Sequence, residues 1–440
     1  MNNDSRRNHW RWAFYDWANS AFATTVMAGF FPLFFKQYWS GDSAVTTSTF
    51  WLGLGNATAS FLIMVLAPLL GALADAGGNY RRLLLSFAGF GMLATAALCL
   101  VDAGQWPWAI LLYILAFIGF SGANVFYDGM LPGLTTPEQR NRVSALGYSL
   151  GYLGGGLLFA INVTMTLKPT WFGLADAAAA VKVSFVMVSL WWAVFALPLA
   201  TARLPASLTT ARRRAHIGGS FRQVLSTLRD ARRHRNLWLF LIAYWFYIDG
   251  VATIIRMAVD YGMAIGLPAN SLITALLLVQ FIGFPCTIVF GRLADHIGTR
   301  RGLWIGLWVY VIATVAAAFM STSLHFHALA CCLGLVQGGV QSLSRALFSQ
   351  LIPVEQQGEY FGFLNMLGKA AAVLGPLLVG VVAATTHSSR IGILSVIVLF
   401  LIGMWFLGKV EEPDLTARSG RERSGVKHPT TSPAKTPADT

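Results

Sequence analysis

The sequence predicts an all-α integral membrane protein in which twelve transmembrane helices form two pseudo-symmetric six-helix lobes. Three observations lead to this fold class: an apolar composition, hydrophobic runs of membrane-spanning length, and sequence blocks that recur in both halves. Of the 440 residues, 55% are hydrophobic and only 12% are charged, and the mean hydropathy is +0.59. This composition is far from that of a soluble globular domain.

The hydrophobic runs give the expected helices in order, because about 20 apolar residues in a helix span the bilayer core. Six runs in the first half lie at about 13–39, 49–73, 83–101, 107–131, 144–167 and 180–201. Six more follow at about 237–259, 271–293, 302–321, 325–349, 361–384 and 390–409. The first run is too long for a signal peptide and is expected to stay in the protein.

Two sequence blocks recur at nearly the same position in each half, which indicates parallel internal repeats. "GALADAGGNYRR" (71–82) follows the second run, and "GRLADHIGTRR" (291–301) follows the eighth. The predicted segments are an N-terminal six-helix lobe at 1–202, a cytoplasmic linker at 203–236, a C-terminal six-helix lobe at 237–410 and a tail at 411–440. The tail is rich in Pro, Ser, Thr and charge, so it cannot bury a core and is expected to be disordered.

The basic residues indicate how the spans are oriented. With the N-terminus in the cytoplasm, the Lys and Arg residues that fall in outer loops are Lys36, Lys168, Lys182 and Arg390. Nearly all the others lie on the inner side, which is the positive-inside bias. It predicts a multi-pass protein of the inner (plasma) membrane with both termini cytoplasmic. The Arg-rich linker would face anionic membrane lipids, and the lack of a base-stacking module argues against nucleic-acid binding.

The duplicated G-x-L-A-D block has a physical interpretation: Gly lets helices approach, Asp lies near a helix end, and the paired Arg residues anchor the next helix among lipid head groups. Together with twelve spans, it resembles the major facilitator superfamily over residues 10–409. In that superfamily the block is a conformational latch between the lobes. The resemblance therefore implies gating roles for Asp75, Arg82, Asp295 and Arg301.

Three further stretches narrow the resemblance: "FYDWANSAF" (14–22), "FYIDG" (246–250) and "GGVQSLSRALFSQLIP" (338–353). They resemble the vacuole-effluxer branch of the superfamily, which is linked to the export of amino acids from the autophagic vacuole and has many bacterial relatives. The resemblance also implies that the first, fourth, seventh and tenth helices line a central cavity.

Six ionisable residues lie inside the predicted spans, where each costs at least about 2.5–3.5 kcal/mol on insertion scales. They are Asp16, Asp128, Asp249, Arg256, Arg345 and Lys369. Except for Lys369, helical spacing places each of them on the same helix face as other polar residues, on the first, fourth, seventh and tenth spans. The neutral residues on these faces include Asn19, Asn124, Gln337 and Gln341. These are the helices that the resemblance assigns to the cavity.

Asp128 and Arg345 occupy symmetry-related positions in the two halves. An acid facing a base in this way fits either an ion pair that closes the cytoplasmic side or a contact with a zwitterionic substrate. Arg345 offers a carboxylate a two-pronged hydrogen bond, which Lys369 does not. We therefore expect Arg345 or Arg256 to contact the carboxylate of a substrate, and we assign Lys369 to gating.

Asp249 lies near the middle of its span, where desolvation favours the neutral form of a carboxyl group. It is either a proton carrier or a permanent partner of Arg256. Asp16 is expected about one turn into the first span. That position favours a gate at the cytoplasmic mouth over a deep binding residue, and an acid favoured by the helix dipole is the third alternative.

The leading hypothesis is a secondary active transporter that moves a small zwitterion, most simply an amino acid, by alternating access, with proton coupling left open. The predicted substrate-binding residues are Asn124, Asp128, Asp249, Arg256, Gln337, Gln341 and Arg345. The predicted proton-coupling residues are Asp249 and Asp128. The predicted gating residues are Asp16, Asn19, Asp75, Arg82, Asp295, Arg301 and Lys369.

Two alternatives stay open: an exporter of amphipathic drugs or peptides, and a non-transporting membrane scaffold or sensor with the same fold. An enzyme is not expected, because no nucleophile, base and orienting group occur together. "GFLNMLGK" (362–369) has neither the glycine spacing nor the Ser or Thr of a phosphate-binding loop. His325 and His327 lack further ligands for a metal site. We expect no cofactor, and a monomer.

Overall fold

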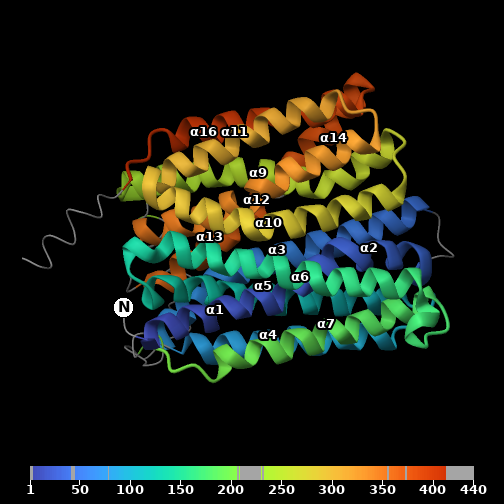
Figure 1. The fold of residues 1–440 in the computed structure, drawn as a ribbon, viewed down its shortest axis with the longest axis horizontal. Helices are drawn as coiled ribbons and strands as arrows, with labels where there is room; N and C mark the ends of the chain where they lie inside the picture. Colours follow the sequence, from blue (N-terminus) through green and yellow to red (C-terminus); the bar gives the residue numbers. More distant parts are fainter. Residues whose placement is uncertain are drawn as a thin grey trace, which may run out of the picture.

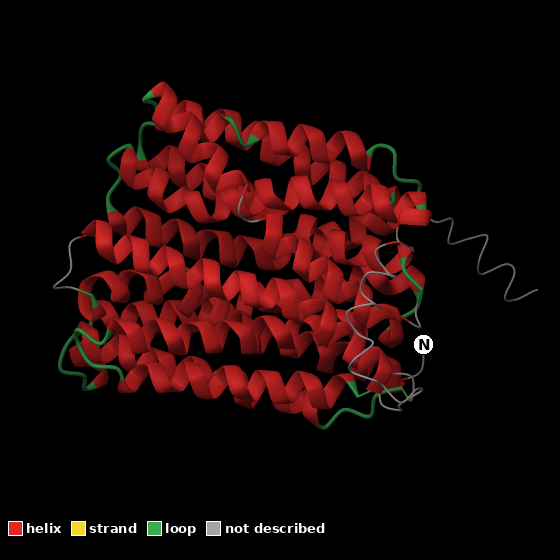
Figure 2. Ribbon diagram, turned by 180° about the vertical axis from the view of Figure 1, so that it is seen from behind, coloured by secondary structure: helices red, strands yellow, loops and turns green. Residues whose placement is uncertain are grey.

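The computed structural model describes residues 3–40, 45–77, 79–205, 208, 229, 232–353, 356–371 and 374–412. Within these ranges the chain is helical, with short connections and no strand (Figure 2). Twelve helical segments in the described part are long and apolar enough to cross a membrane. The predicted fold class is confirmed.

The first half contains six of these segments. The first is continuous and consists of α1 (Asn3–Ala21), η1 (Phe22–Phe30), α2 (Phe31–Phe34) and η2 (Phe35–Trp39), where η1 and η2 are π-helical. The next five are α3 (Val45–Gly77), α4 (Tyr80–Ala97), α5 (Trp106–Leu134), α6 (Arg140–Leu167) and α7 (Ala177–Ala200). Short 3₁₀ turns, η3 (Leu98–Leu100), η4 (Pro137–Gln139) and η5 (Pro169–Phe172), lie between them.

The second half contains the other six. Four are single helices: α9 (Arg235–Ala264), α10 (Ala269–Ile297), α11 (Thr299–Ala318) and α12 (Ser323–Leu351). The eleventh segment consists of α13 (Gln357–Ala371) and α14 (Leu374–Thr386), and the twelfth of α15 (Ser389–Leu394) and α16 (Ile397–Leu407). Pro376 lies in the first turn of α14, where a missing backbone N–H is tolerated.

The first helix begins earlier than its hydrophobicity predicts. It starts at Asn3, because a polar, Arg-rich stretch that the apolar run excludes is also helical. Asp16 therefore lies about three and a half turns into α1, not about one turn as expected. This correction moves Asp16 from the edge of the molecule to its interior, where only 9% of the residue is exposed.

The helices of the two halves gather on opposite sides of the molecule, with α4 and α7 at one edge and α11 and α16 at the other (Figure 1). Buried apolar residues form one cluster from Trp12 to Leu208 and another from Leu237 to Val410. We propose 1–202 and 237–410 as the two lobes. Most of the 203–236 linker, and residues 413–440 of the predicted tail, lie outside the described residues.

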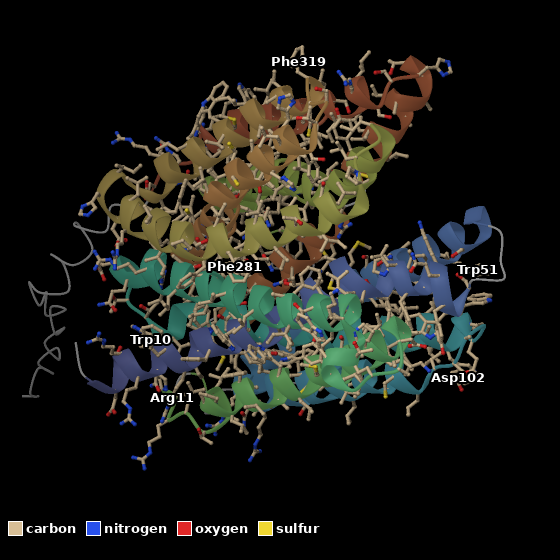
Figure 3. All side chains as sticks on the ribbon, turned by 45° about the vertical axis from the view of Figure 1, so that its right-hand side comes forward. Trp10, Arg11, Trp51, Asp102, Phe281 and Phe319 are labelled. Atoms are coloured by element: carbon tan, nitrogen blue, oxygen red, sulfur yellow. The ribbon has the colours of Figure 1, made fainter. Side chains whose placement is uncertain are left out.

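Helices of the two halves pack directly against each other: α6 contacts α10 and α12, and α13 contacts α3 and α5. The halves lie close together at the end that carries Trp10 and Arg11, and they diverge toward the end that carries Trp51 and Asp102 (Figure 3). We call these ends the N-terminal face and the opposite face. The divergence leaves room between the halves for the site described below.

Candidate functional site

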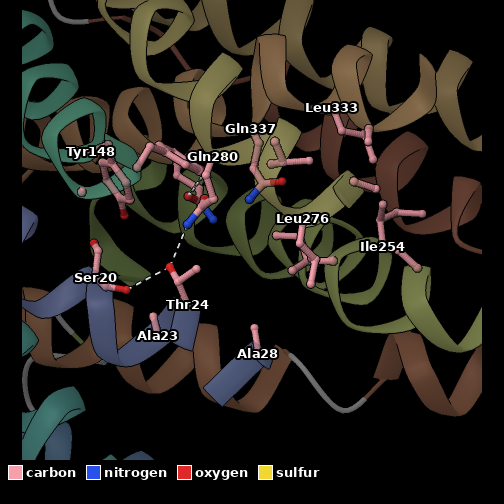
Figure 4. A pocket seen from close by; sticks show the side chains of 18 of the residues that line it. Ser20, Ala23, Thr24, Ala28, Tyr148, Ile254, Leu276, Gln280, Leu333 and Gln337 are labelled. Atoms are coloured by element: carbon pink, nitrogen blue, oxygen red, sulfur yellow. Dashed lines mark hydrogen bonds between the residues drawn. The ribbon is translucent and has the colours of Figure 1, made fainter. Parts of the chain in front are cut away.

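A cavity of about 500 Å³ lies between the halves. The polar residues that line it from the first half include Asp16, Asn19, Ser20, Thr24, Asn124 and Asp128. Those from the second half include Gln280, Gln337, Gln341, Arg345, Asn365 and Lys369. Figure 4 shows Ser20 and Tyr148 on one side and the apolar Ile254, Leu276 and Leu333 on the other. The cavity thus has a polar part and an apolar part.

A buried cluster of charges joins the halves at the polar part. Arg345 Nη1 on α12 donates to Asp128 Oδ1 on α5 at 3.0 Å and lies 3.7 Å from Asp16 Oδ2 on α1. Arg345 Nε and Nη2 donate to the side-chain and backbone oxygens of Ser144 on α6, both at 2.9 Å. The structure therefore brings together three of the predicted residues, and it adds Ser144, which the sequence analysis missed.

Aromatic rings surround this cluster. The guanidinium carbon of Arg345 lies 4.3 Å from the ring centre of Tyr148 and 4.8 Å from that of Trp12. The Tyr127 hydroxyl donates to Asp16 Oδ2 at 3.1 Å. Contacts between a cation and aromatic faces are stronger where water is excluded. The rings therefore help to hold the buried guanidinium charge, a role that residue spacing alone did not indicate.

Amide side chains extend the polar part. Asn19 Nδ2 donates to Asn124 Oδ1 at 2.6 Å, so these two predicted residues contact each other. Asn365 Nδ2 donates to Asp128 Oδ2 at 3.3 Å. Gln341 accepts a hydrogen bond from the Tyr152 hydroxyl across the halves at 3.2 Å. The predicted amide residues Asn19, Asn124, Gln337 and Gln341 all line the cavity, where they can contact a ligand.

Gln280 bridges the halves farther from the N-terminal face, next to Thr24 on the first segment. Its Nε2 donates to Thr24 Oγ1 at 2.7 Å, and the Thr24 hydroxyl donates to the Ser20 carbonyl oxygen at 3.0 Å (Figure 4). The sequence analysis missed Gln280 and Asn365. Each is a polar side chain within an apolar run, and this signal would have found them if neutral residues on every span had been considered.

Asp249 and Arg256, both predicted to bind substrate, are not among the residues that line the cavity. Asp249 is 1% exposed, and its Oδ1 accepts a hydrogen bond from the Gly375 N–H at 3.1 Å. Thr253 Oγ1 lies 3.5 Å from the same oxygen. Asp249 thus caps the start of α14 from α9. Arg256 lies one to two turns after Asp249 on the same helix, near enough for their opposite charges to attract.

At the N-terminal face, Asp75 of α3 contacts the start of α13, and we call this contact the first latch. The Asp75 carboxylate accepts hydrogen bonds from the backbone N–H groups of Gly358 at 2.9 Å and Glu359 at 2.8 Å, and from the Tyr80 hydroxyl. These N–H groups lie in the first turn of α13, where they lack partners within the helix. A carboxylate is favoured there by the helix dipole. Asp75 therefore ties the first half to a helix of the second.

The second latch joins α10 to α6. Asp295 pairs with Arg142, and it accepts a hydrogen bond from Asn141 Nδ2 at 3.4 Å. The predicted gating residues Arg82 and Arg301 are exposed, and their side chains make no such contact among the described residues. The arginines that precede them in the sequence instead bind helix ends within each half. Arg81 donates to the Ala202 carbonyl at 2.6 Å, and Arg300 to the Gly408 carbonyl at 3.4 Å.

With this geometry in view, comparison with known proteins identifies the family. Residues 38–414 match the family described as "Vacuole effluxer Atg22 like". The chain belongs to this family. One relative of this Atg22-like chain is the uncharacterized MFS-type transporter YxiO of Bacillus subtilis (strain 168). It is 38% identical over 409 residues, which cover 92% of this chain and 95% of the relative.

Solved structures share the fold of this Atg22-like protein. The human organic anion transporter MFSD10 superposes with a TM-score of 0.71 at 15% identity, covering 92% of this chain and 100% of that chain. The major facilitator superfamily (MFS) transporter FucP in its outward conformation superposes with a TM-score of 0.70 at 13% identity, covering 93% and 99%. The Atg22-like chain is thus a multi-pass membrane transporter with the MFS fold.

Proposed function

We propose that this Atg22-like transporter carries a small zwitterionic solute, in the simplest case an amino acid, by alternating access. The observation that carries the proposal is the balance of charge in the cavity wall. Its acidic and basic residues are Asp16, Asp128, Arg345 and Lys369. At the polar cluster two carboxylates face one guanidinium, and Lys369 supplies a positive charge elsewhere in the wall. A solute with one positive and one negative group would neutralise both excesses.

The proposed orientation places the N-terminal face in the cytoplasm of a plasma-membrane protein, because this face carries most of the basic residues. Both latches lie there, which supports a state closed to the cytoplasm. Two residues near the opposite face line the cavity: Met320 follows the end of α11, and Phe326 lies in the first turn of α12. Access from the outer side in this state fits the divergence of the halves.

The proposed proton site is Asp249, with Asp128 as the second candidate. Asp249 Oδ2 is buried and has no hydrogen-bond partner among the described residues. An unpaired buried carboxylate oxygen is costly, and protonation would lower that cost. If Asp249 carries the coupled proton, Asp249→Asn should abolish the response of transport to a pH gradient while exchange of solute continues. A variant that still responds to the gradient would remove Asp249 from this role.

The experiment that tests the main proposal is counterflow of a labelled amino-acid mixture into proteoliposomes containing the purified full-length protein. Runs with and without an imposed pH gradient separate solute transport from proton coupling. Uptake above that of empty vesicles supports an amino-acid carrier. The absence of uptake under both conditions would refute it.

A second candidate function is the export of amphipathic drugs or peptides. The apolar part of the cavity, which includes Ile254, Leu276 and Leu333, favours it. A drug-resistance assay in cells that express the protein distinguishes this function from amino-acid transport. The scaffold alternative is tested by deleting residues 413–440, because a transporter should keep its flux whereas a tail-dependent scaffold should lose its effect.

A further inference from the structure

A zwitterionic solute needs a cation for its carboxylate, and Arg345 is already bound between the halves. All three of its guanidinium nitrogens donate to the first half, to Ser144 and Asp128 at 2.9–3.0 Å. Only 4% of Arg345 is exposed. The N–H groups that are not used are buried with the residue, so a ligand would reach them only if the halves moved apart. In this state, Arg345 therefore acts as a lock between the halves.

Lys369 differs from Arg345 in its surroundings. It lies on α13 one turn after Asn365, and both residues line the cavity. Its ammonium nitrogen lies 4.6 Å from the ring centre of Phe117 on α5. No hydrogen bond or ion pair joins this ammonium to another residue in the described part of the chain. A ring face balances only part of the cost of a desolvated cation, so the ammonium remains available to an anion.

The region around Lys369 also favours a negative ligand group. Arg256 on α9 lies near enough to repel the Lys369 ammonium electrostatically. An anion in the cavity beside the Lys369 ammonium would offset this repulsion, which is strong at low dielectric. Asp249 acts on Arg256 but is held at the start of α14, away from the cavity wall.

We propose that Lys369, rather than Arg345, binds the carboxylate of the transported solute. This inference rests on the proposed function and names the site of its negative group. The ammonium group of the solute then faces the polar cluster, where Asp16 and Asp128 carry one more charge than Arg345 neutralises. Lys369 is suited to this task because its compact ammonium on a flexible stem can follow a ligand that enters and leaves.

The test compares amino acids with their amides, which keep the ammonium and the side chain but lack the negative carboxylate. In proteoliposomes, unlabelled acids and amides compete with counterflow of the labelled amino-acid mixture. Wild-type protein should prefer the acids by about tenfold to 100-fold, as expected for a hydrogen bond between charged groups. In Lys369→Met, the affinity for acids should fall to that for amides, and the affinity for amides should not change.

The controls separate a ligand contact from a structural role. Lys369→Arg keeps the positive charge and should keep the preference for acids. Lys36→Met removes an exposed cation at the end of the first segment, outside the cavity, and should change neither affinity. Lys369→Gln serves as a second neutral variant if Lys369→Met does not fold.

Different results would overturn the assignment of Lys369 and the proposed amino-acid transport. Neutral Lys369 variants that keep the wild-type preference for acids would overturn the assignment of Lys369. Wild-type protein without any amino-acid counterflow would overturn the proposed function itself.

Discussion

Each of the three guanidinium nitrogens of Arg345 donates a hydrogen bond to the opposite half of the molecule. Such a buried ion pair adds little net stability compared with apolar packing, but removal of one partner leaves a buried charge without compensation. Here the acids exceed the base, since Asp16 and Asp128 both face Arg345. The cluster is therefore sensitive to any change in its single cation.

We predict that Arg345→Gln lowers the free energy of unfolding by about 3–5 kcal/mol, because two buried carboxylates lose their shared cation. The double variant Arg345→Gln/Asp128→Asn should lose less, because one of these charges is gone. Thermal unfolding of both variants in the same detergent measures the difference. A double variant less stable than the single one would contradict this account of the cluster.

A second residue-scale prediction concerns Gly375 in the first turn of α14. A Cβ at this position would lie 1.8 Å from Thr253 Oγ1 and 2.9 Å from Asp249 Oδ1. Gly375→Ala should therefore lower stability by about 1–3 kcal/mol, the usual cost of overpacking. Gly375→Ala/Thr253→Ala should recover part of the loss. Gly380→Ala on the same helix meets no atom within 4 Å and is the matched control in thermal unfolding.

At the scale of helices, the closed N-terminal face depends on two close contacts between elements of different halves. On α3, a Cβ at Gly71 would lie 2.0 Å from the Gly358 carbonyl oxygen on α13. On α10, a Cβ at Gly291 would lie 2.5 Å from the Cβ of Ala145 on α6. The latch carboxylates Asp75 and Asp295 lie four residues after these glycines, one turn along each helix. Glycine thus lets the helices approach, and the carboxylate then holds them.

We predict that Gly71→Ala separates α3 from α13, because the opposing atom belongs to the backbone and cannot move aside independently. The N–H groups of Gly358 and Glu359 would lose their bonds to Asp75. Hydrogen–deuterium exchange of peptides from the start of α13 should become faster than in wild type. Gly89→Ala on α4, where a Cβ meets no atom within 4 Å, should leave exchange unchanged. Equal exchange in Gly71→Ala and wild type would argue against the latch.

At the scale of the whole molecule, the two halves are joined at the N-terminal face and diverge toward the opposite face. The charge cluster and both latches lie on the closed side of the cavity. Alternating access then requires these contacts to break together while the opposite face closes. Transport should be impossible when any one of them is made permanent.

We predict that a short thiol cross-linker between Arg142→Cys and Asp295→Cys stops amino-acid counterflow, because it fixes the second latch in its closed form. The native cysteines are first replaced: Cys99, Cys286, Cys331 and Cys332. Each single-cysteine variant treated with the same reagent should remain active, and cleavage of the cross-linker should restore flux. Undiminished counterflow in the fully cross-linked protein would exclude opening at this latch as part of the cycle.

The sequence by itself determined the fold class, the approximate positions of the twelve spans and the ionisable residues within them. These features depend on local properties, namely runs of apolar residues and the recurrence of the G-x-L-A-D block. The sequence also placed Asp128 and Arg345 at symmetry-related positions, but it left open whether they form an ion pair or contact a substrate. The start of α1 could not be predicted from the sequence, because a polar stretch such as the one that contains Arg11 has no apolar signal even when it is helical.

Only the tertiary structure decided which of the buried charges meet. Asp249 shares a helical stripe with Arg256, yet packing turns it toward the start of α14 and away from the cavity. No pattern in the sequence predicts that Ser144 accepts two hydrogen bonds from Arg345. The physical reason is that the spacing of residues along a helix defines a face but not what that face contacts. The rotation and close approach of helices from both halves determine the contact.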